Sequence, residues 1–350
     1  MTRTGPTRTL ARAALIGGPV LVGAAAVARF AATNLCTFRR DWWSVLAAGY
    51  TEKQVVVDGV VINYGEGPAR GKPPLLLIHG QASDWKSYAP ALPELAAMFH
   101  VYAVDVPGHG GSDRIADGYT ATGIGALLKR FVDDVIGEPV VLSGHSSGGH
   151  LAAWLAANAP DDVTAVLLED PPMFTTLLPR AEKTWNWVDL ATCCHSFLTA
   201  DDTDFVRYYW VHQYMWKYFG AGADRIRRLG TRSRDRHPDR PLALWWWPVN
   251  NLLRSMQTYD PVFGDAFYTD RWDEGFDHES TLKAVVQQTI YVHTAVDFDG
   301  DILRGAASDD DAARIAQLLP NARLVQTDTG HGFHDEDPAH FVRLLDELRR

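Results

Sequence analysis

One short motif constrains the fold of this chain more than any other feature. Residues 144–148 read Gly-His-Ser-Ser-Gly, a G-x-S-x-G pattern, between an apolar segment at 140–142 and an alanine-rich segment at 147–159. A strand, a sharp turn and then a helix form the context of a nucleophile elbow, in which small neighbours allow a strained backbone and close chain approach. The motif predicts that Ser146 projects from a strand end as a nucleophile, with a helix N-terminus beside a developing oxyanion.

Short apolar segments alternate with helical patterns on both sides of this motif. Such alternation predicts an α/β class, with a mostly parallel central sheet flanked by helices. Residues 54–64 predict a hairpin, because Asp58-Gly59 is a preferred two-residue turn. Further strands are predicted at residues 75–78, 101–104, 163–168, 289–293 and 322–326.

The alternation stops at about residue 173 and resumes at about residue 285, and eight of the 12 tryptophans lie in between. We predict one sheet domain in two parts, residues 50–172 and 285–350, interrupted by a helical cap insertion at 173–284. At least half of the prominent cap tryptophans should form the core of the cap, and some should line a pocket. These tryptophans are Trp185, Trp187, Trp210, Trp216, Trp245, Trp246 and Trp247.

The N-terminus has the pattern of a targeting segment. Three arginines precede an apolar run at residues 13–27, and Ala26-Val27-Ala28 is an A-x-A cleavage candidate. The run is short for a spanning helix, although tilt could accommodate it. We predict a signal or anchor segment over residues 1–35, and hence an exported or membrane-anchored protein, with a cytoplasmic protein as the alternative.

The charge of the chain argues against nucleic acid as a partner. The formal net charge is −10, and no basic stripe runs through the sequence. One arginine-rich run at residues 225–236 is interrupted by Asp235 and preceded by Asp224, and we interpret it as a solvated face.

The three cysteines predict neither a disulfide nor a zinc site. Cys193 and Cys194 are adjacent and therefore poorly placed to bridge each other, and Cys36 stands alone. There is no CxxC motif and no Cys/His metal spacing, so we expect no metal and no cofactor.

Three more motifs complete a family pattern. His79-Gly80-Gln81 follows the strand at 75–78, D-x-P-G-H-G-x-S begins at Asp105 after the next strand, and Gly330-His331 precedes Glu336 by five residues. Together with G-H-S-x-G-G they resemble the α/β-hydrolase superfamily, in the branch that includes epoxide hydrolases, haloalkane dehalogenases, cofactor-free haloperoxidases and carbon–carbon bond hydrolases. The resemblance covers residues 55–170 and 285–350.

The resemblance implies a set of roles. His331 would take the Ser146 proton and return it to the leaving group. The backbone N–H groups of Gln81 and Ser147 would form an oxyanion hole, and the Asp105 loop would be structural. Other histidines are expected to have no catalytic role: His79 and His145 as structural side chains, His334 and His340 at the surface or in loops, and His195 and His212 in the cap.

The acid that orients His331 is less sharply defined. The resemblance places it after the strand at 289–293, where His293-Thr294-Ala295-Val296-Asp297 has the family spacing with Thr294 in place of a glycine. We predict Asp297 as this acid. A shift of the loop would choose Asp299 instead, and some relatives carry the acid one strand earlier, at the position of Asp170.

The nucleophile type narrows the reaction. Epoxide hydrolases and haloalkane dehalogenases of this fold use an aspartate at the elbow, whereas Ser146 suits attack on a carbonyl carbon. We predict a serine hydrolase that cleaves a small hydrophobic carboxylic ester or related carbonyl compound through an acyl-enzyme. The alternatives are a cofactor-free lyase, perhydrolase or acyltransferase with the same triad, and a slow-turnover receptor for a small apolar ligand.

Overall fold

The computed structural model describes residues 29, 37–69, 71–116, 118–242 and 247–349. The signal or anchor segment predicted over residues 1–35 lies almost wholly outside these ranges. Within them, no helix combines the length and the apolar character needed to cross a membrane.

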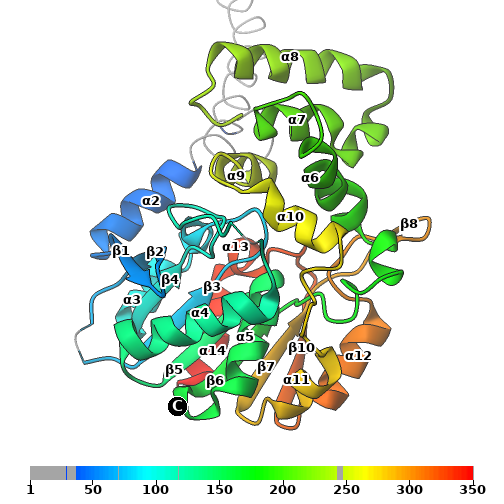
Figure 1. Cartoon of the computed structure of the whole chain (residues 1–350). Coiled ribbons are helices and arrows are strands. Elements are labelled where there is room, and N and C mark those ends of the chain that lie inside the picture. The colour runs from blue at the N-terminus through cyan, green and yellow to red at the C-terminus, as the bar shows by residue number, and fades with distance from the viewer. Residues whose placement is uncertain (1–28, 30–36, 70, 117, 243–246, 350) are drawn as a thin grey trace, which may run out of the picture.

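An eight-stranded sheet forms the centre of the molecule (Figure 1). The strand order is β1-β2-β4-β3-β5-β6-β7-β10, antiparallel at β1-β2 and β2-β4 and parallel elsewhere, as the α/β class predicts. The predicted hairpin is confirmed, because Val57 pairs with Val60 and both turn residues have positive φ. The strands are β1 (Thr51–Val57), β2 (Val60–Glu66), β3 (Pro74–Ile78), β4 (His100–Val104), β5 (Val140–His145), β6 (Val163–Glu169), β7 (Gln288–His293) and β10 (Ala322–Gln326).

Helices cover both faces of this sheet because each face of its central strands is apolar. Leu75 and Leu77 of β3 belong to one buried cluster, Leu76 and Ile78 to the other, and all four are fully buried. Strands buried on both faces read as continuous apolar runs, which is why β3 was predictable. One face packs on α2 (Thr37–Ala47), α3 (Leu92–Met98) and α14 (Pro338–Leu348), the other on α4 (Ala121–Phe131), α5 (Ser147–Asn158), α11 (His278–Ala284) and α12 (Asp309–Leu318).

The chain between β6 and β7 forms a helical layer above the sheet (Figure 1). Trp210 and Trp216 are buried inside this layer with their rings 4.9 Å apart in an edge-on arrangement, so they serve as cap core. Trp245 and Trp246 lie outside the described residues. The helices of the layer are α6 (Thr192–Phe197), α7 (Phe205–His212), α8 (Ala223–Arg236), α9 (Trp247–Ser255) and α10 (Pro261–Tyr268).

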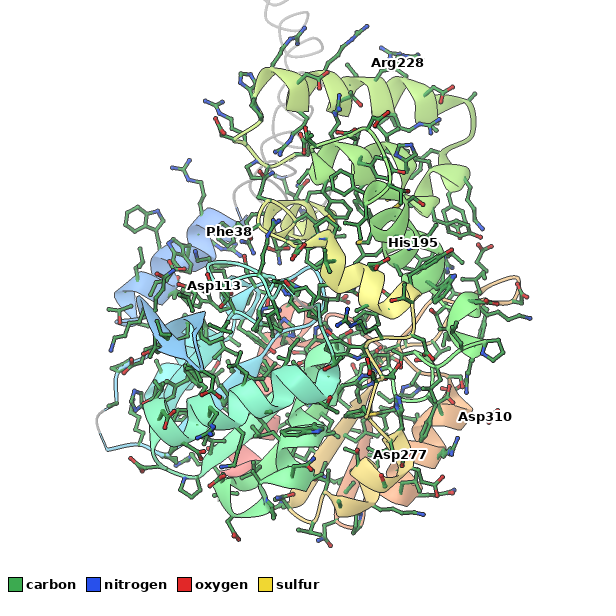
Figure 2. The ribbon with its side chains drawn as sticks, in the orientation of Figure 1. Phe38, Asp113, His195, Arg228, Asp277 and Asp310 are labelled. Atoms are coloured by element: carbon green, nitrogen blue, oxygen red, sulfur yellow. The ribbon has the colours of Figure 1, made fainter. Side chains whose placement is uncertain are left out.

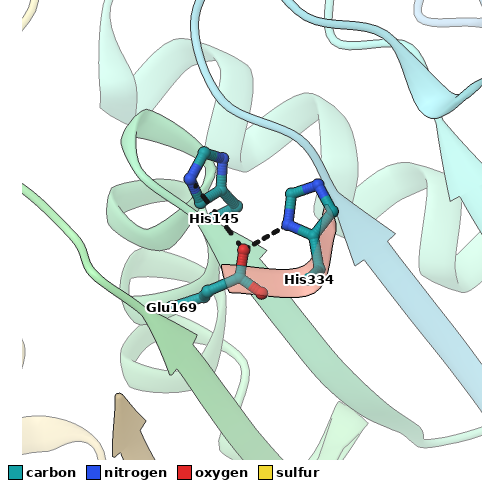
Figure 3. Close-up of side chains that lie close together, drawn as sticks. All are labelled: His145, Glu169 and His334. Carbon is teal, nitrogen blue, oxygen red and sulfur yellow. Dashed lines mark hydrogen bonds and ion pairs between the residues drawn. The ribbon is translucent and has the colours of Figure 1, made fainter. Parts of the chain in front are cut away.

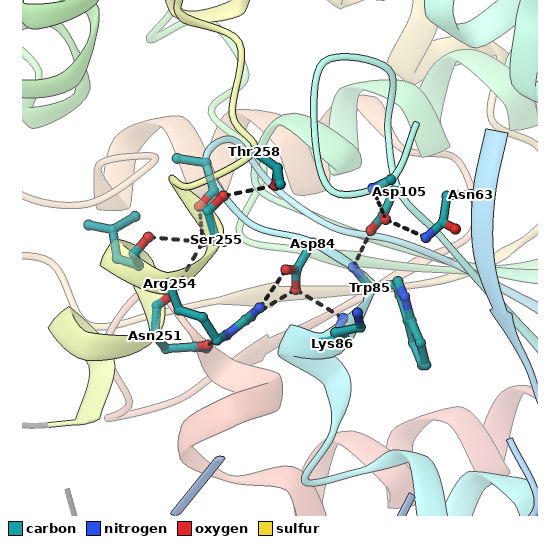
Figure 4. A network of polar contacts seen from close by, with 12 residues as sticks. Asn63, Asp84, Trp85, Lys86, Asp105, Asn251, Arg254, Ser255 and Thr258 are labelled. Atoms are coloured by element: carbon teal, nitrogen blue, oxygen red, sulfur yellow. Dashed lines mark hydrogen bonds and ion pairs between the residues drawn. The ribbon is translucent and has the colours of Figure 1, made fainter. Parts of the chain in front are cut away.

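A polar network fastens this cap to the sheet domain (Figure 4). The Arg254 guanidinium of α9 donates two hydrogen bonds, of 2.6 and 2.8 Å, to the Asp84 carboxylate in the loop after β3. Asp105, at the end of β4, accepts from the amide of Trp85 at 2.8 Å and from the side chain of Asn63 at 2.7 Å. Bidentate charge-assisted hydrogen bonds are among the stronger polar contacts, so the Arg254–Asp84 pair holds α9 of the cap against the loop after β3. Asp105 is structural, as predicted.

Candidate active site

Ser146 occupies a strained turn between β5 and α5. Its φ of 54° and ψ of −124° are unfavourable for a residue with a Cβ, and such strain persists only where the surroundings enforce it. The surroundings here are tight: a Cβ on Gly144 would lie 2.2 Å from the Gly148 carbonyl oxygen, and one on Gly148 would lie 2.3 Å from that of Ile78. The glycines of the motif are therefore required by backbone packing, and they hold Ser146 at the strand end.

Ser146 lines a cavity of about 650 Å³ between the sheet and the cap. His331, Gln81 and Ser147 line the same cavity from three different segments of the chain. Of the tryptophans predicted to contribute to a pocket, Trp185 and Trp187 do so. The large apolar and aromatic wall residues are Trp185, Trp187, Leu190, Tyr209, Leu252 and Phe267.

His331 is held in one tautomer by a buried carboxylate. Its Nδ1 lies 2.7 Å from Oδ2 of Asp170. Because a carboxylate only accepts at this distance, Nδ1 carries the proton and Nε2 is left as the basic nitrogen. Enclosure in the protein lowers the pKa of His331, but the hydrogen bond and negative charge of Asp170 outweigh that effect and raise it above the ordinary value.

Asp170 follows directly after β6, and its side chain is 1% exposed. Its Oδ2 also accepts a hydrogen bond of 2.7 Å from the Thr294 hydroxyl, and its amide donates to the Val292 carbonyl in β7. Burial would raise the pKa of Asp170, yet the hydrogen bonds from His331 and Thr294 and the nearby imidazole of His293, 3.6 Å from Oδ1, hold it well below the ordinary range. The group is therefore an ionised acceptor.

The structure corrects the predicted pairing of Asp297 with His331. The Asp297 carboxylate is 62% exposed; it accepts from the Phe298 amide at 2.7 Å and pairs with Arg304 at the cavity rim. Asp299, the first alternative, pairs with Lys217 on the cap. Both lie where the chain after β7 leaves the sheet edge to form the small hairpin of β8 (Phe298–Asp299) and β9 (Ile302–Leu303). The second alternative, Asp170, is the carboxylate that contacts His331.

The two amides expected to form an oxyanion hole lie beside the nucleophile. Ser147 is the first residue of α5, so its N–H has no acceptor within the helix. The side chain of Gln81 donates to the Tyr259 hydroxyl at 2.8 Å, which anchors the turn after β3. A Cβ on Gly80 would lie 2.8 Å from the Cβ of Ser146, so this turn packs directly against the elbow. The role of the two amides stays a prediction.

His145 and His334 both point toward the Glu169 carboxyl (Figure 3), and the His145 ring centre lies 4.7 Å from that of His331. His145 Nε2 is 2.8 Å from the His331 carbonyl oxygen, and because that oxygen only accepts, Nε2 is the donor. His334 Nδ1 donates to Glu169, the neighbour of Asp170. His334 is 3% exposed, so its predicted place at the surface or in a loop is wrong. The signal that could have found it was Glu169, a carboxyl at the end of an apolar strand that needs a buried partner.

The same three side chains offer one ligand atom each within 4.8 Å of one another. One ring nitrogen of each histidine is engaged as an N–H donor, in His145 to the His331 carbonyl and in His334 to Glu169. His145 Nδ1 and Glu169 Oε2 have no hydrogen-bond partner among the described residues. Burial raises the pKa of Glu169 to about 7 and lowers those of His145 and His334 to about 3 and about 4. We assign the cluster a supporting role under the His331 loop.

His79 is a structural histidine, as predicted. Its buried ring lies between two backbone groups: Nε2 accepts from the Val106 amide at 3.0 Å, and Nδ1 donates to the Gly80 carbonyl at 2.8 Å. Burial lowers the pKa of His79 to about 4, which keeps the ring neutral. The ring thus joins the turns after β3 and β4.

Comparison with known proteins agrees with this architecture. A family model described as the alpha/beta hydrolase fold matches residues 73–192, a range that holds Gln81, Ser146 and Asp170. In that fold the nucleophile lies at a sharp turn between a strand of the central sheet and a helix, and Ser146 lies at such a turn between β5 and α5. The chain has the α/β-hydrolase fold.

Among curated proteins, the lipase LipV of Mycobacterium tuberculosis is 38% identical over 121 residues, which are 33% of this chain and 43% of LipV. A dihydrolipoyllysine-residue acetyltransferase component of the acetoin cleaving system of Cupriavidus necator is 36% identical over 118 residues, 34% of this chain and 31% of that protein. The matched segment spans less than half the length of both relatives.

Solved structures extend the likeness over nearly the whole chain. A membrane phospholipase A, described as a bacterial virulence factor, superposes with a TM-score of 0.61 at 21% identity, covering 96% of this chain and 98% of that one. The enol-lactonase from Burkholderia xenovorans gives 0.58 at 18% identity, covering 85% and 99%. At such identities the likeness concerns the fold.

Proposed function

We propose that this protein is a serine hydrolase that cleaves carboxylic esters or closely related carbonyl compounds with a hydrophobic group. The observation that carries the proposal is the contact of His331 with Asp170 at the cavity into which the strained Ser146 turn faces. The three residues follow the chain order nucleophile, acid, histidine that is usual in this fold.

The chemistry follows from the proton positions. With Nδ1 of His331 donating to Asp170, Nε2 accepts the Ser146 hydroxyl proton as the oxygen attacks the carbonyl carbon. The negative charge that develops on the carbonyl oxygen is stabilised by the amides of Gln81 and Ser147. The imidazolium returns its proton to the leaving group, and water then releases the acyl group from Ser146 by the same route in reverse.

The cavity supports a hydrophobic substrate. The large side chains that the cap contributes to its wall are apolar or aromatic, and smaller polar residues of the same segment, such as Thr184 and Asn186, lie among them. Burying an acyl chain against such walls contributes roughly 0.8 kcal/mol per methylene. Relatives and neighbours named lipase, phospholipase A and enol-lactonase point to the same class of bond.

A p-nitrophenyl ester series from acetate to laurate tests the proposal. We expect kcat/KM to rise with acyl length until the cavity is filled, and a fluorophosphonate to label Ser146. Ser146→Ala should abolish both ester hydrolysis and fluorophosphonate labelling. Ser196 is a cap serine that does not line the cavity, so Ser196→Ala should leave both unchanged. A label mapped to another serine, or full activity in Ser146→Ala, would contradict the proposal.

The same preparation separates hydrolysis from the other reactions of this fold. Products formed in water should be the free acid and alcohol in equal amounts. If added alcohols or peroxide capture most of the acyl group at low concentration, the enzyme is a transferase or perhydrolase. A single burst of product without turnover would indicate a slow receptor.

A further inference from the structure

The outermost helix of the cap, α8, carries a charge opposite to that of the molecule. It lies on the side of the cap remote from the sheet (Figure 1), with Arg228 pointing outward (Figure 2). Six arginines and two aspartates occur between Ala223 and Arg236, whereas the whole chain has a formal net charge of −10. The positive charge is therefore concentrated locally.

The inner face of α8 accounts for only part of this charge. A Cβ on Gly230 would lie 2.2 Å from the Trp210 ring, so the helix packs closely on α7 there. Arg234, on the same face, is buried and donates to Asp204 at 2.7 Å. Arg227 pairs with Asp224 along the helix. These contacts stabilise the cap. The residues on the opposite face of α8 are exposed and take no part in them.

The outer face is a stripe of four arginines around one leucine, which we call the arginine stripe. Its members recur three or four residues apart, the spacing of a single helical face, and all are exposed. None of the four arginines forms an ion pair with a described residue, since Asp224 pairs with Arg227 and Asp235 with Arg207. The stripe consists of Arg225, Arg228, Leu229, Arg232 and Arg236.

Like charges at this spacing repel one another and destabilise an isolated helix, so the stripe has an intrinsic cost that an anionic partner would relieve. Leu229 indicates which partner. It is 52% exposed at the centre of the stripe, with Arg225 and Arg232 on either side along the same face. A leucine gains nothing from a phosphate backbone in water, but it gains from insertion between lipid headgroups while the arginines contact their phosphates.

We propose that the arginine stripe of α8 docks the cap onto an anionic phospholipid bilayer. The four guanidinium groups contact lipid phosphates, and the Leu229 side chain enters the headgroup layer. The helix then lies parallel to the bilayer surface, with the cap between the bilayer and the sheet domain. This proposal goes beyond the proposed function and does not depend on it.

A fluorescent label that reads the polarity at α8 tests this docking in the full-length chain. Leu229→Cys, made together with Cys36→Ser, accepts a polarity-sensitive dye, since Cys193 and Cys194 are buried. We expect the dye to shift to the blue with vesicles of phosphatidylcholine and phosphatidylglycerol at low salt. It should not shift with phosphatidylcholine alone, and high salt should reverse the shift by screening. A dye on Val286→Cys, an exposed apolar site just before β7, is the matched control and should not respond.

Charge variants complete the test. Changing all four stripe arginines to glutamine should weaken the vesicle-dependent shift roughly tenfold or more, whereas changing them to lysine should largely preserve it. Both variants should keep the circular dichroism spectrum of the parent, which verifies folding. An absent shift with anionic vesicles, an equal shift in the glutamine variant, or a shift with duplex DNA alone would overturn the proposal. Because the dye reports contact at α8 itself, attachment through another segment would not imitate the result.

Discussion

The Nδ1 atom of His331 lies 2.7 Å from the Oδ2 atom of Asp170, although 161 residues separate them along the chain. The contact spans the sheet edge, because Asp170 follows β6 and His331 follows β10, with β7 in between. Asp170 is almost completely buried and also accepts from Thr294, so its position does not depend on His331 alone.

This contact predicts which carboxylate matters for turnover. Asp170→Asn should lower kcat by roughly 10³- to 10⁴-fold, because an amide at this position favours the wrong imidazole tautomer. Asp297→Asn is the matched control: it should cost less than about tenfold, since the exposed Asp297 pairs with Arg304 and not with His331. Ester hydrolysis under saturating substrate measures both. A severe loss in Asp297→Asn with a mild one in Asp170→Asn would reverse the assignment.

The same contact sets the direction of the pH dependence. His331 accepts a proton only when its imidazole is neutral, so fluorophosphonate labelling of Ser146 should slow as the pH falls. Because Asp170 raises the pKa of His331, the loss should begin above the ordinary histidine value of about 6.5. Asp170→Asn should shift the pH at which labelling slows to a lower value. A labelling rate that stays constant from about pH 8 to about pH 5 would argue against a histidine base.

Activity should require glycine at position 80, because there is no room for a side chain there. An added Cβ would lie 2.8 Å from the Ser146 Cβ, so Gly80→Ala must displace either the turn after β3 or the nucleophile. We expect kcat to fall on the order of 10²-fold, as for a misplacement of about 1 Å. Gly222→Ala, with open space around the new methyl group, should keep parental kcat. Circular dichroism of both variants checks that the fold is retained; unchanged turnover in Gly80→Ala would contradict the packing argument.

Glu169 should make the protein less stable as the pH rises. Burial raises the pKa of Glu169 from 4.5 to about 7, so between these values the folded chain holds a proton that the unfolded chain releases. The free energy of unfolding therefore falls across this window, and the loss is complete above it. Glu169→Gln removes the effect, so the decrease from pH 5 to pH 8 should shrink by up to about 3 kcal/mol.

Urea unfolding at the two pH values measures this difference. Glu347→Gln, which changes an exposed carboxyl on α14, should keep the parental pH dependence. If the parent and Glu169→Gln lost the same stability between the two pH values, the buried carboxyl would be ionised throughout.

Local sequence patterns determined much of the fold, and at the site they identified Ser146 and His331. The hairpin at Asp58-Gly59, the apolar strands and the elbow at Ser146 each depend on residues within a few positions of one another, and each is where the pattern predicted it. The motif at Gly330-His331 likewise marked the histidine that lines the cavity with Ser146.

The tertiary structure alone decided which carboxylate meets His331 and where the neighbouring histidine lies. Asp170 and Asp297 follow adjacent strands, and both positions are compatible with a triad. The choice depends on the path of the chain after β7, which turns outward and leaves Asp297 exposed at the rim. His334 is buried because Glu169 points under the same loop. These pairings join residues more than 160 positions apart, and their geometry is set by the packing of β6, β7 and the His331 loop, which no local pattern records.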